Sequence, residues 1–307
     1  MKKLAKIVFF GNERLATGVT SSPLILKSLV DGGYDVVALV LHLADKTTIE
    51  PSAEYAKSVN IPIIYSDDVA ITTNTLAGLS ADVGVLAAFG QIVPETLIHL
   101  FPLGIINLHP SRLPAYRGPT PIEQAILDGL ESTAVSIMQL GPGMDSGPVF
   151  AQRDVEIYDQ ETKQRLSERL QEEGCKLMME VLPDILSGTL IPTEQDHDKK
   201  TVCRLLTKQS GAVDWADEAR VIEKSIRAFA GWPRSKATIG SIAVIITKAH
   251  AVPAGNGMPG SVEITDPPGI LNVNCGEGYL CIEALIPIGK KEMNAREFLN
   301  GYKARII

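Results

Sequence analysis

The chain has 307 residues, about twice the usual size of one domain, so we expect two domains or one large one. Hydrophobic residues make up 45% and charged residues 21% of the chain, which is typical of globular proteins and excludes disordered and collagen-like classes. No run approaches the roughly 18 unbroken apolar residues that a membrane span needs, and the N-terminal apolar run is too short for a secretory signal. The four cysteines form no C-x-x-C pair, which argues against a disulfide framework or a zinc ribbon. We therefore expect a cytoplasmic protein.

The net charge of −7 is unevenly distributed along the chain. Residues 1–189 carry 14 Lys and Arg against 23 Asp and Glu, a net charge of −9. Residues 190–307 carry 15 against 13, a net charge of +2. The total argues against a polyanionic partner, but the distribution leaves the second part of the chain able to bind one.

Short β-rich runs alternate with helical patterns over the first 150 residues. This alternation is typical of β-α-β units and predicts a Rossmann-like α/β domain with a mostly parallel sheet. The expected strands are 7–10, 36–41, 61–65, 83–89, 104–109 and 135–140. Helices are expected at 23–31, 52–59, after Pro94 and at 121–127, and a longer helix at 162–186.

The pattern changes after the long helix. A polar stretch with Pro192, Asp196 and Lys199 predicts a connector, and the runs beyond it have the short strands and Gly/Pro-rich turns of a small antiparallel β-barrel. We therefore expect a first domain at 1–189, a linker at 190–207, and a smaller OB-like domain at 208–307.

Familiar nucleotide and hydrolase motifs are absent. The turn after the first strand, Gly11 to Gly18, lacks the G-x-G-x-x-G spacing of dinucleotide-binding proteins, and no P-loop pattern occurs. In the run Gly143 to Gly147 the serine is fourth of five residues, whereas a nucleophile elbow requires it third. Nicotinamide chemistry, P-loop chemistry and serine hydrolysis are disfavoured.

One constellation does point to chemistry. Asn107 and His109 alternate on one face at the predicted C-terminal end of a parallel strand, where open α/β sheets bind ligands. Asp145 follows a later strand in a Gly-rich loop. An amide, an imidazole and a carboxylate together suit attack of an amine on an acyl carbon, with Asn107 stabilising the oxyanion, His109 moving a proton and Asp145 orienting the imidazole.

The motifs around these residues resemble the 10-formyltetrahydrofolate-dependent formyltransferases. The resemblance lies in the run from Asn107 to Pro114, in Tyr116-Arg117-Gly118 and in Met144-Asp145-Ser146-Gly147. The second half of the chain resembles those members of the family that act on methionyl-tRNA. The segments that carry this second resemblance are Val213-Asp214-Trp215, Ile226-Arg227-Ala228-Phe229, Trp232-Pro233, and Gly289-Lys290-Lys291-Glu292-Met293 before Phe298-Leu299.

The resemblance implies a formyltransferase fold and a function. It implies that Asn107, His109 and Asp145 are catalytic, and that the formyl group of 10-formyltetrahydrofolate passes to the free α-amino group of initiator methionyl-tRNA, with no metal. The formylmethionyl-tRNA so formed serves translation initiation, the domain 208–307 binds tRNA, and the chain is expected to be a monomer. The residues that it assigns to the folate site are Ser111, Arg112, Leu113 and Pro114, with Phe89, Gly90, Gln91 and Ile92 offering backbone groups to the pterin.

Two alternatives remain open. A formyltransferase that acts on a small amine, such as an amino sugar or a glycinamide nucleotide, would use the same three residues, although the second domain argues against it. A nucleic-acid-binding module on an inactive scaffold would use the charges of Lys199, Lys200, Arg204 and Lys208, which are equally those of a solvated face. The stretch 42–50 is short and hardly basic, whereas members of the family usually carry a longer basic loop there that enters the tRNA acceptor stem.

Overall fold

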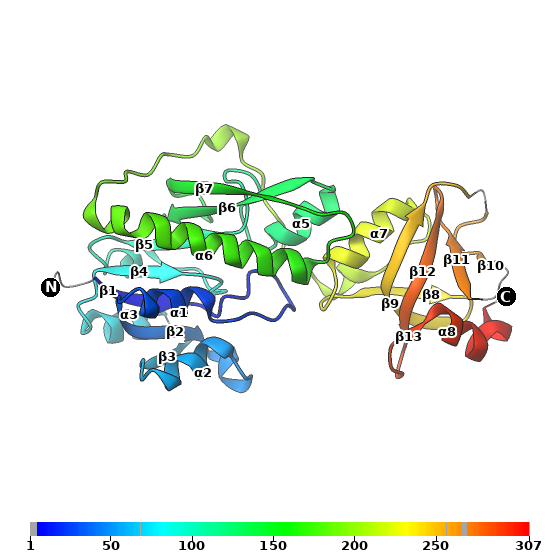
Figure 1. The fold of residues 1–307 in the computed structure, drawn as a ribbon, viewed down its shortest axis with the longest axis horizontal. Coiled ribbons are helices and arrows are strands. Elements are labelled where there is room, and N and C mark those ends of the chain that lie inside the picture. Colours follow the sequence, from blue (N-terminus) through cyan, green and yellow to red (C-terminus); the bar gives the residue numbers. More distant parts are fainter. Residues whose placement is uncertain (1–4, 68, 256, 266–268, 307) are drawn as a thin grey trace. The chain divides into compact units, whose positions relative to one another are not determined.

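The computed structural model describes residues 5–67, 69–255, 257–265 and 269–306. They form two compact units (Figure 1). Unit 1 comprises the residues up to Ile122 together with Glu131–Ile157 and Gln164–Leu205, and unit 2 comprises Glu123–Leu130, Tyr158–Lys163 and the chain from Leu206 onward. Two short segments, 123–130 and 158–163, therefore belong to unit 2 although they are flanked in sequence by unit 1.

Unit 1 contains a seven-stranded sheet in the order β3-β2-β1-β4-β5-β6-β7. The first five strands pair in parallel, whereas β6 is antiparallel to β5 and β7 is antiparallel to β6. The predicted mostly parallel sheet is confirmed. The strands are β1 (Lys6–Phe10), β2 (Asp35–His42), β3 (Ile63–Ser66), β4 (Val83–Leu86), β5 (Ile105–His109), β6 (Ser132–Gln139) and β7 (Val149–Glu156).

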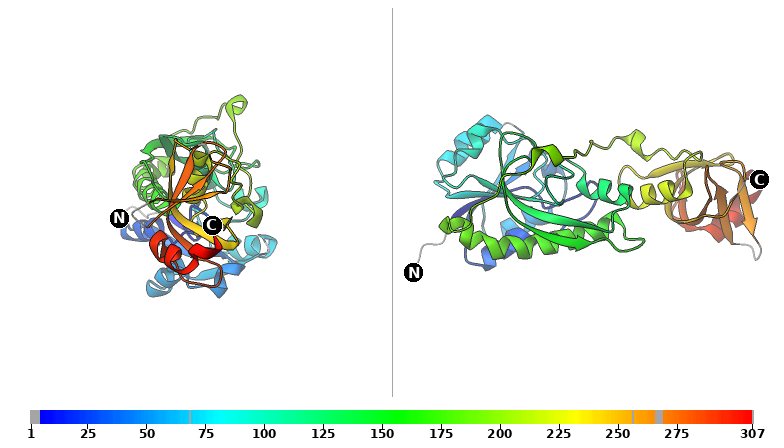
Figure 2. Two further views of the ribbon diagram at one scale, coloured as in Figure 1. Left: turned by 90° about the vertical axis from the view of Figure 1, so that its right-hand side faces the viewer. Right: turned by 90° about the horizontal axis from the view of Figure 1, so that it is seen from above.

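Helices cover both faces of this sheet (Figures 1 and 2). On one face α6 (Lys163–Ser187) lies beside α1 (Leu24–Asp31), where the Cys175 thiol contacts Ser28 Oγ at 3.2 Å. On the other face α3 (Val69–Ala77) and α4 (Glu95–Ile98) join a buried apolar cluster with β1, β2 and β4. The remaining helical segments of unit 1 are η1 (Leu43–Thr47), α2 (Pro51–Ser58) and η2 (His197–Lys199), whereas α5 (Pro121–Asp128) begins in unit 1 and lies in unit 2 from Glu123 onward.

Unit 2 is built on an antiparallel sheet in the order β10-β11-β12-β9-β8, with β13 paired to β12. The amphipathic helix α7 packs on the core of this sheet through Ile222 and Ile226, and α8 packs on it through Phe298. A smaller antiparallel domain after the α/β domain is therefore confirmed. Its elements are η3 (Lys208–Gly211), α7 (Ala219–Ala228), β8 (Ser235–Ile239), β9 (Ile242–Val252), β10 (Val262–Thr265), β11 (Ile270–Asn274), β12 (Tyr279–Pro287), β13 (Met293–Asn294), α8 (Ala295–Tyr302) and η4 (Lys303–Arg305).

A buried ion pair ties the two early segments of unit 2 to its later residues. The ammonium of Lys163 lies 3.5 Å from Oε1 of Glu123 and donates a hydrogen bond of 2.8 Å to the carbonyl oxygen of Trp232. Both charged side chains are fully buried. A buried charge is tolerated only with such partners, so this contact fixes both segments within unit 2.

The predicted linker, 190–207, is part of unit 1 as far as Leu205. Thr193 forms a backbone bridge with Val149, and Val202 forms one with Arg117. The polar composition of this stretch reflects its exposed side chains, while its backbone hydrogen bonds hold it against the sheet domain. Among the described residues, no helix has the length and apolar character needed to cross a bilayer.

Candidate active site

Asn107 and His109 lie at the C-terminal end of β5, and the parallel pairing of β5 with β4 confirms the predicted strand end. Leu108, between them, faces α6, where it meets Gly174. Because strand side chains alternate, Asn107 and His109 share the opposite face. Asn107 is only 5% exposed, and among the described residues its carboxamide has no hydrogen-bond partner. Its polar atoms are not among the fully buried atoms without a partner, so they still reach solvent and can bind a ligand.

The imidazole of His109 contacts two acceptors. Nε2 lies 3.0 Å from the carbonyl oxygen of Tyr116, and Nδ1 lies 3.6 Å from Oδ2 of Asp145. A carbonyl oxygen only accepts, so Nε2 carries a hydrogen and donates it to Tyr116. In the neutral ring, Nδ1 then has a free lone pair beside Asp145. The structure thus brings His109 and Asp145 together.

Asp145 lies beside His109 because β6 runs antiparallel to β5. In the antiparallel β5–β6 ladder, Ser136 pairs with His109 and Gln139 pairs with Ile106. The loop after Gln139 therefore leaves β6 beside the start of β5 and turns back toward His109. Asp145 adopts a left-handed backbone with φ of +46°, and its Oδ2 accepts a hydrogen bond of 2.8 Å from the amide of Gly118.

Gly118 is required by its surroundings. Its φ is +111°, and a Cβ on it would lie 2.8 Å from the carbonyl oxygen of Cys203. Only glycine fits this close approach, which places its amide against the carboxylate of Asp145. Cys203 comes from the segment predicted as a linker, so that segment shapes the site. Sequence reasoning missed this contribution, because the stretch carries no motif beyond its polar composition.

The predicted folate segment 111–114 is divided between interior and surface. Ser111 is fully buried, and its hydroxyl donates a hydrogen bond of 2.7 Å to the carbonyl oxygen of Ala115. Leu113 is also buried, while Arg112 is exposed and forms an ion pair with Asp154. Pro114 is half-buried. The side chains of Ser111 and Leu113 therefore shape the loop from within.

The second predicted folate segment, 89–92, follows β4. Phe89 is buried and packs edge-to-face on Phe10, with 5.6 Å between ring centroids. Gly90 is exposed with φ of +76° and has open space around it. Gln91 donates a hydrogen bond of 3.0 Å to the carbonyl oxygen of Ser66, but its own buried Oε1 has no partner among the described residues. Ile92 is 82% exposed.

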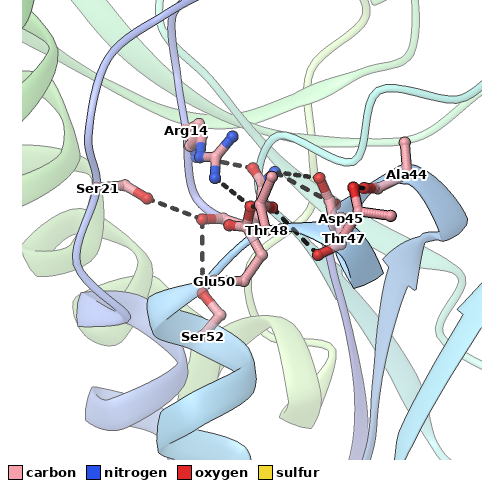
Figure 3. Close-up of polar contacts among 9 residues, drawn as sticks. Arg14, Ser21, Ala44, Asp45, Thr47, Thr48, Glu50 and Ser52 are labelled. Carbon is pink, nitrogen blue, oxygen red and sulfur yellow. Dashed lines mark hydrogen bonds and ion pairs between the residues drawn. The ribbon is translucent and has the colours of Figure 1, made fainter.

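The short stretch 42–50 is a folded turn held by a polar cluster (Figure 3). The carboxamide of Asn12 donates to both carboxylate oxygens of Asp45 at 3.3 Å, and Thr48 donates a 2.7 Å hydrogen bond to Glu50. Arg14 forms an ion pair with the same buried Glu50. Arg14 thus brings a cation, from the loop after β1, to the turn after β2. Among the described residues, no group of three or more metal-binding side chains occurs.

Two family patterns match the chain. The formyl transferase pattern matches residues 66–182, and the pattern of the formyl transferase C-terminal domain matches residues 205–303. Methionyl-tRNA formyltransferase of Chloroflexus aurantiacus is 33% identical over 97% of this chain and 97% of its own length. The enzyme of the same name from Myxococcus xanthus is 34% identical over 97% of this chain and 95% of its own length.

Solved structures share the fold. An N-formyltransferase from Helicobacter canadensis, in complex with folinic acid and dTDP-3-aminofucose, matches 95% of this chain and all of its own at a TM-score of 0.69 and 17% identity. HypX from Aquifex aeolicus, in complex with tetrahydrofolic acid, matches 98% of this chain and 48% of its own at a TM-score of 0.67 and 14% identity. The matched patterns and the identities over nearly the whole chain agree with one another. The chain therefore belongs to the methionyl-tRNA formyltransferase family of formyl transferase enzymes.

Proposed function

We propose that this enzyme transfers the formyl group of 10-formyltetrahydrofolate to the α-amino group of initiator methionyl-tRNA, giving formylmethionyl-tRNA for translation initiation. The observation that carries the proposal is the carboxamide of Asn107, which has no hydrogen-bond partner among the described residues and lies at the strand end that also presents the His109–Asp145 pair. A fixed donor beside a proton carrier is what acyl transfer to an amine requires.

Each of the three residues has a role in this reaction. The amino nitrogen forms a bond to the formyl carbon, and the carboxamide of Asn107 donates to the oxygen as it gains charge. The free lone pair of His109 Nδ1 accepts the proton that the amine loses. The imidazolium so formed has an acceptor at each nitrogen, Asp145 at Nδ1 and the Tyr116 carbonyl at Nε2. The same proton then passes to the departing N10 as its bond to carbon breaks, which leaves tetrahydrofolate.

The residues after β4 fit a folate. A pterin ring presents several N–H donors, and the buried Oε1 of Gln91 is an acceptor without a protein donor among the described residues. Gly90 leaves its surroundings open to a flat ring, and the exposed Ile92 offers an apolar contact. Neighbours with the same fold have folates bound, which supports a folate as the co-substrate.

We consider seven of the basic residues in 190–307 as candidates for contacts with the phosphates of a tRNA. Two of them are already paired with carboxylates, Lys199 with Asp196 at 2.8 Å and Lys248 with Glu283 at 2.6 Å. The others are exposed and, within the described part of the chain, have no carboxylate partner: Lys200, Arg204, Lys208, Lys290 and Lys291. Together with the match to the C-terminal family pattern, they support a tRNA acceptor over a small amine.

The test is formyl transfer from 10-formyltetrahydrofolate to charged initiator tRNA, compared with transfer to free methionine, an amino sugar nucleotide and glycinamide ribonucleotide. We expect turnover with methionyl-tRNA only. Calorimetric titration with a stable folate analogue checks the donor separately. Preferred turnover of a small amine, or no analogue binding at millimolar concentration, would contradict the acceptor or the donor respectively.

A further inference from the structure

We infer that Gln195 is a positioning residue for the reaction, because its carboxamide holds the backbone that carries Asp145. Its Nε2 donates a hydrogen bond of 2.9 Å to the carbonyl oxygen of Asp145 and one of 2.6 Å to the carbonyl oxygen of Gly147. The residue is only 7% exposed, so water does not compete for these contacts. One amide group thereby holds the backbone carbonyls on both sides of Ser146.

These hydrogen bonds support an unusual backbone conformation at Asp145. Asp145 has φ of +46°, a left-handed backbone that residues other than glycine adopt mainly where local hydrogen bonds support it. The Gly118 amide holds the carboxylate of Asp145, while Gln195 holds its main chain. Without Gln195, the strained peptide can relax to an extended conformation, and the carboxylate then moves away from the imidazole of His109.

Arg117 fixes the orientation of the Gln195 carboxamide. The guanidinium donates from Nε and Nη2 to Oε1 of Gln195 at 3.0 Å and 2.6 Å. Arginine only donates and the two backbone carbonyls only accept, so the amide can satisfy all of these partners in one orientation alone. The other side-chain partner of Arg117 among the described residues is Nδ1 of His197, at 3.0 Å.

The same short stretch also contacts His109. Tyr116 supplies the carbonyl that accepts from His109, Arg117 orients Gln195, and Gly118 binds the carboxylate of Asp145. The backbone of Arg117 is in turn paired on both sides, with Thr201 and Cys203. Gln195 therefore belongs to a continuous network that sets the separation of His109 and Asp145, although it touches neither the imidazole nor the carboxylate.

Two substitutions separate this role from simple packing. Gln195→Ala removes both donors and the acceptor. Gln195→Glu keeps an acceptor for Arg117 but cannot donate to the two carbonyls. We expect each to lower kcat roughly 10²-fold with little change in KM for either substrate, since small displacements of catalytic groups cost about this much. Gln171→Ala is the matched control, because Gln171 is also buried but donates to Glu13 and to the Ser22 carbonyl and has none of the contacts of Gln195. We expect it to lose stability and keep its kcat.

A second readout does not depend on turnover. The NMR resonances of the His109 ring nitrogens are assigned among those of the five histidines by comparison with His109→Gln. They should shift in Gln195→Ala in the same direction as in Asp145→Asn. They should not shift in Gln171→Ala. The choice of assay rests on the proposed function. If wild-type enzyme formylates none of the acceptors, that function fails while the resonances still test Gln195. Wild-type kcat or unshifted His109 resonances in Gln195→Ala would overturn the inference, as would full activity of Gln195→Glu.

Discussion

At the scale of single residues, the site depends on groups held by main-chain contacts as much as by side chains. His109 is oriented by the carbonyl of Tyr116, and Asp145 by the amide of Gly118. The strained φ of Asp145 is a local cost that a functional position can carry when its surroundings fix it. Removing any of these contacts should therefore affect turnover more than folding.

His109→Ala and Asp145→Asn test the pair directly. The first removes the proton carrier, and the second removes the negative charge that faces the imidazolium. We expect each to lower kcat at least about 10²-fold, which is the lower range for lost acid–base catalysis, with thermal unfolding close to wild type. Steady-state kinetics with saturating folate measures this. Near-wild-type turnover in either variant would exclude that residue from the mechanism.

Gly118→Ala tests the close approach that binds Asp145. The new Cβ would lie 2.8 Å from the carbonyl oxygen of Cys203, and alanine is strained at φ of +111°. We expect a loss of about 1–3 kcal/mol in the free energy of unfolding from the backbone strain, together with lower kcat. Gly188→Ala is the control, because Gly188 has φ of +73° with open space around it and lies outside the site. We expect Gly188→Ala to lower the free energy of unfolding, measured by urea denaturation, and to leave kcat unchanged, measured by steady-state kinetics. Equal kcat in the two variants would contradict the role of Gly118.

At the scale of elements, helix α1 takes its N-terminal cap from a distant residue. Pro23 precedes the helix and supplies no side-chain cap, so the carboxyl group of Glu13 accepts from the amides of Ile25 and Leu26 at 2.8 Å and 3.0 Å. Burial raises the pKa of Glu13 from 4.5 to about 7, although these hydrogen bonds lower it in part. The cap is therefore a group whose protonation changes near neutral pH.

This cap gives the stability of the chain a defined pH dependence. Between pH 4.5 and about 7 the folded state holds a proton on Glu13 that the unfolded state has lost, so stability falls as pH rises and levels off above pH 7. The full effect is about 3 kcal/mol, at 1.36 kcal/mol for each pKa unit. We expect Glu13→Gln to remove this pH dependence. The measurement is the free energy of unfolding of wild type minus that of the variant, from urea denaturation between pH 4.5 and 8. A difference that stays constant with pH would contradict the buried, titrating cap.

The elements that could be predicted from sequence are those with a strong apolar period. The buried β5 and the long α6 have this signal, and so do β9 to β12 of the second unit, whereas β8 and β13 were not predicted. Strand β7 was not predicted because it is the last strand of the sheet and its apolar residues do not alternate: Val149, Phe150 and Ala151 are consecutive, and four polar or charged residues dominate the rest. Helix α3 was not predicted from the sequence because its β-branched residues, threonines among them, have weak helix propensity.

The candidate site divides in the same way. Asn107 and His109 could be predicted from alternation at a strand end, and the approach of Asp145 from its motif. The reversal of β6, which sends the loop back toward His109, has no local sequence signal because strand direction is set by long-range pairing. Gln195 could not be found either, since its partners are mostly backbone carbonyls distant in sequence.

At the scale of the whole molecule, the charge contrast is weaker than the sequence halves indicate. Assigned by unit, unit 1 carries 16 Lys and Arg against 22 Asp and Glu, and unit 2 carries 13 against 14. The net charges are −6 and −1, because four acidic residues and Lys163, which precede residue 190, belong to unit 2. Attraction of the proposed tRNA substrate then rests on local cations without carboxylate partners.

The salt dependence of tRNA binding tests this reasoning. Each neutralised phosphate contributes roughly −0.7 to −0.9 to the slope of log affinity against log salt. We expect Lys290→Gln with Lys291→Gln to reduce the slope by about 1.4 to 1.8 in the full-length enzyme, two such contributions. Lys248→Gln with Lys199→Gln, which removes cations already paired with carboxylates, is the matched control and should change the slope less. Equal effects, or no slope in wild type, would favour a small-amine acceptor.

The discontinuous composition of unit 2 also limits how this gene can recombine. The chain passes between the units five times, at the boundaries after Ile122, Leu130, Ile157, Lys163 and Leu205. A single recombination crossover near residue 190 would combine a C-terminal segment from another protein with the original segments 123–130 and 158–163, which belong to the same unit. The partner of the buried Lys163 is a main-chain carbonyl, which any residue type supplies, so the donor segment must match in its backbone path at position 232 and not in its side chain there. A donor whose backbone places this carbonyl elsewhere would leave the buried ammonium without one of its partners.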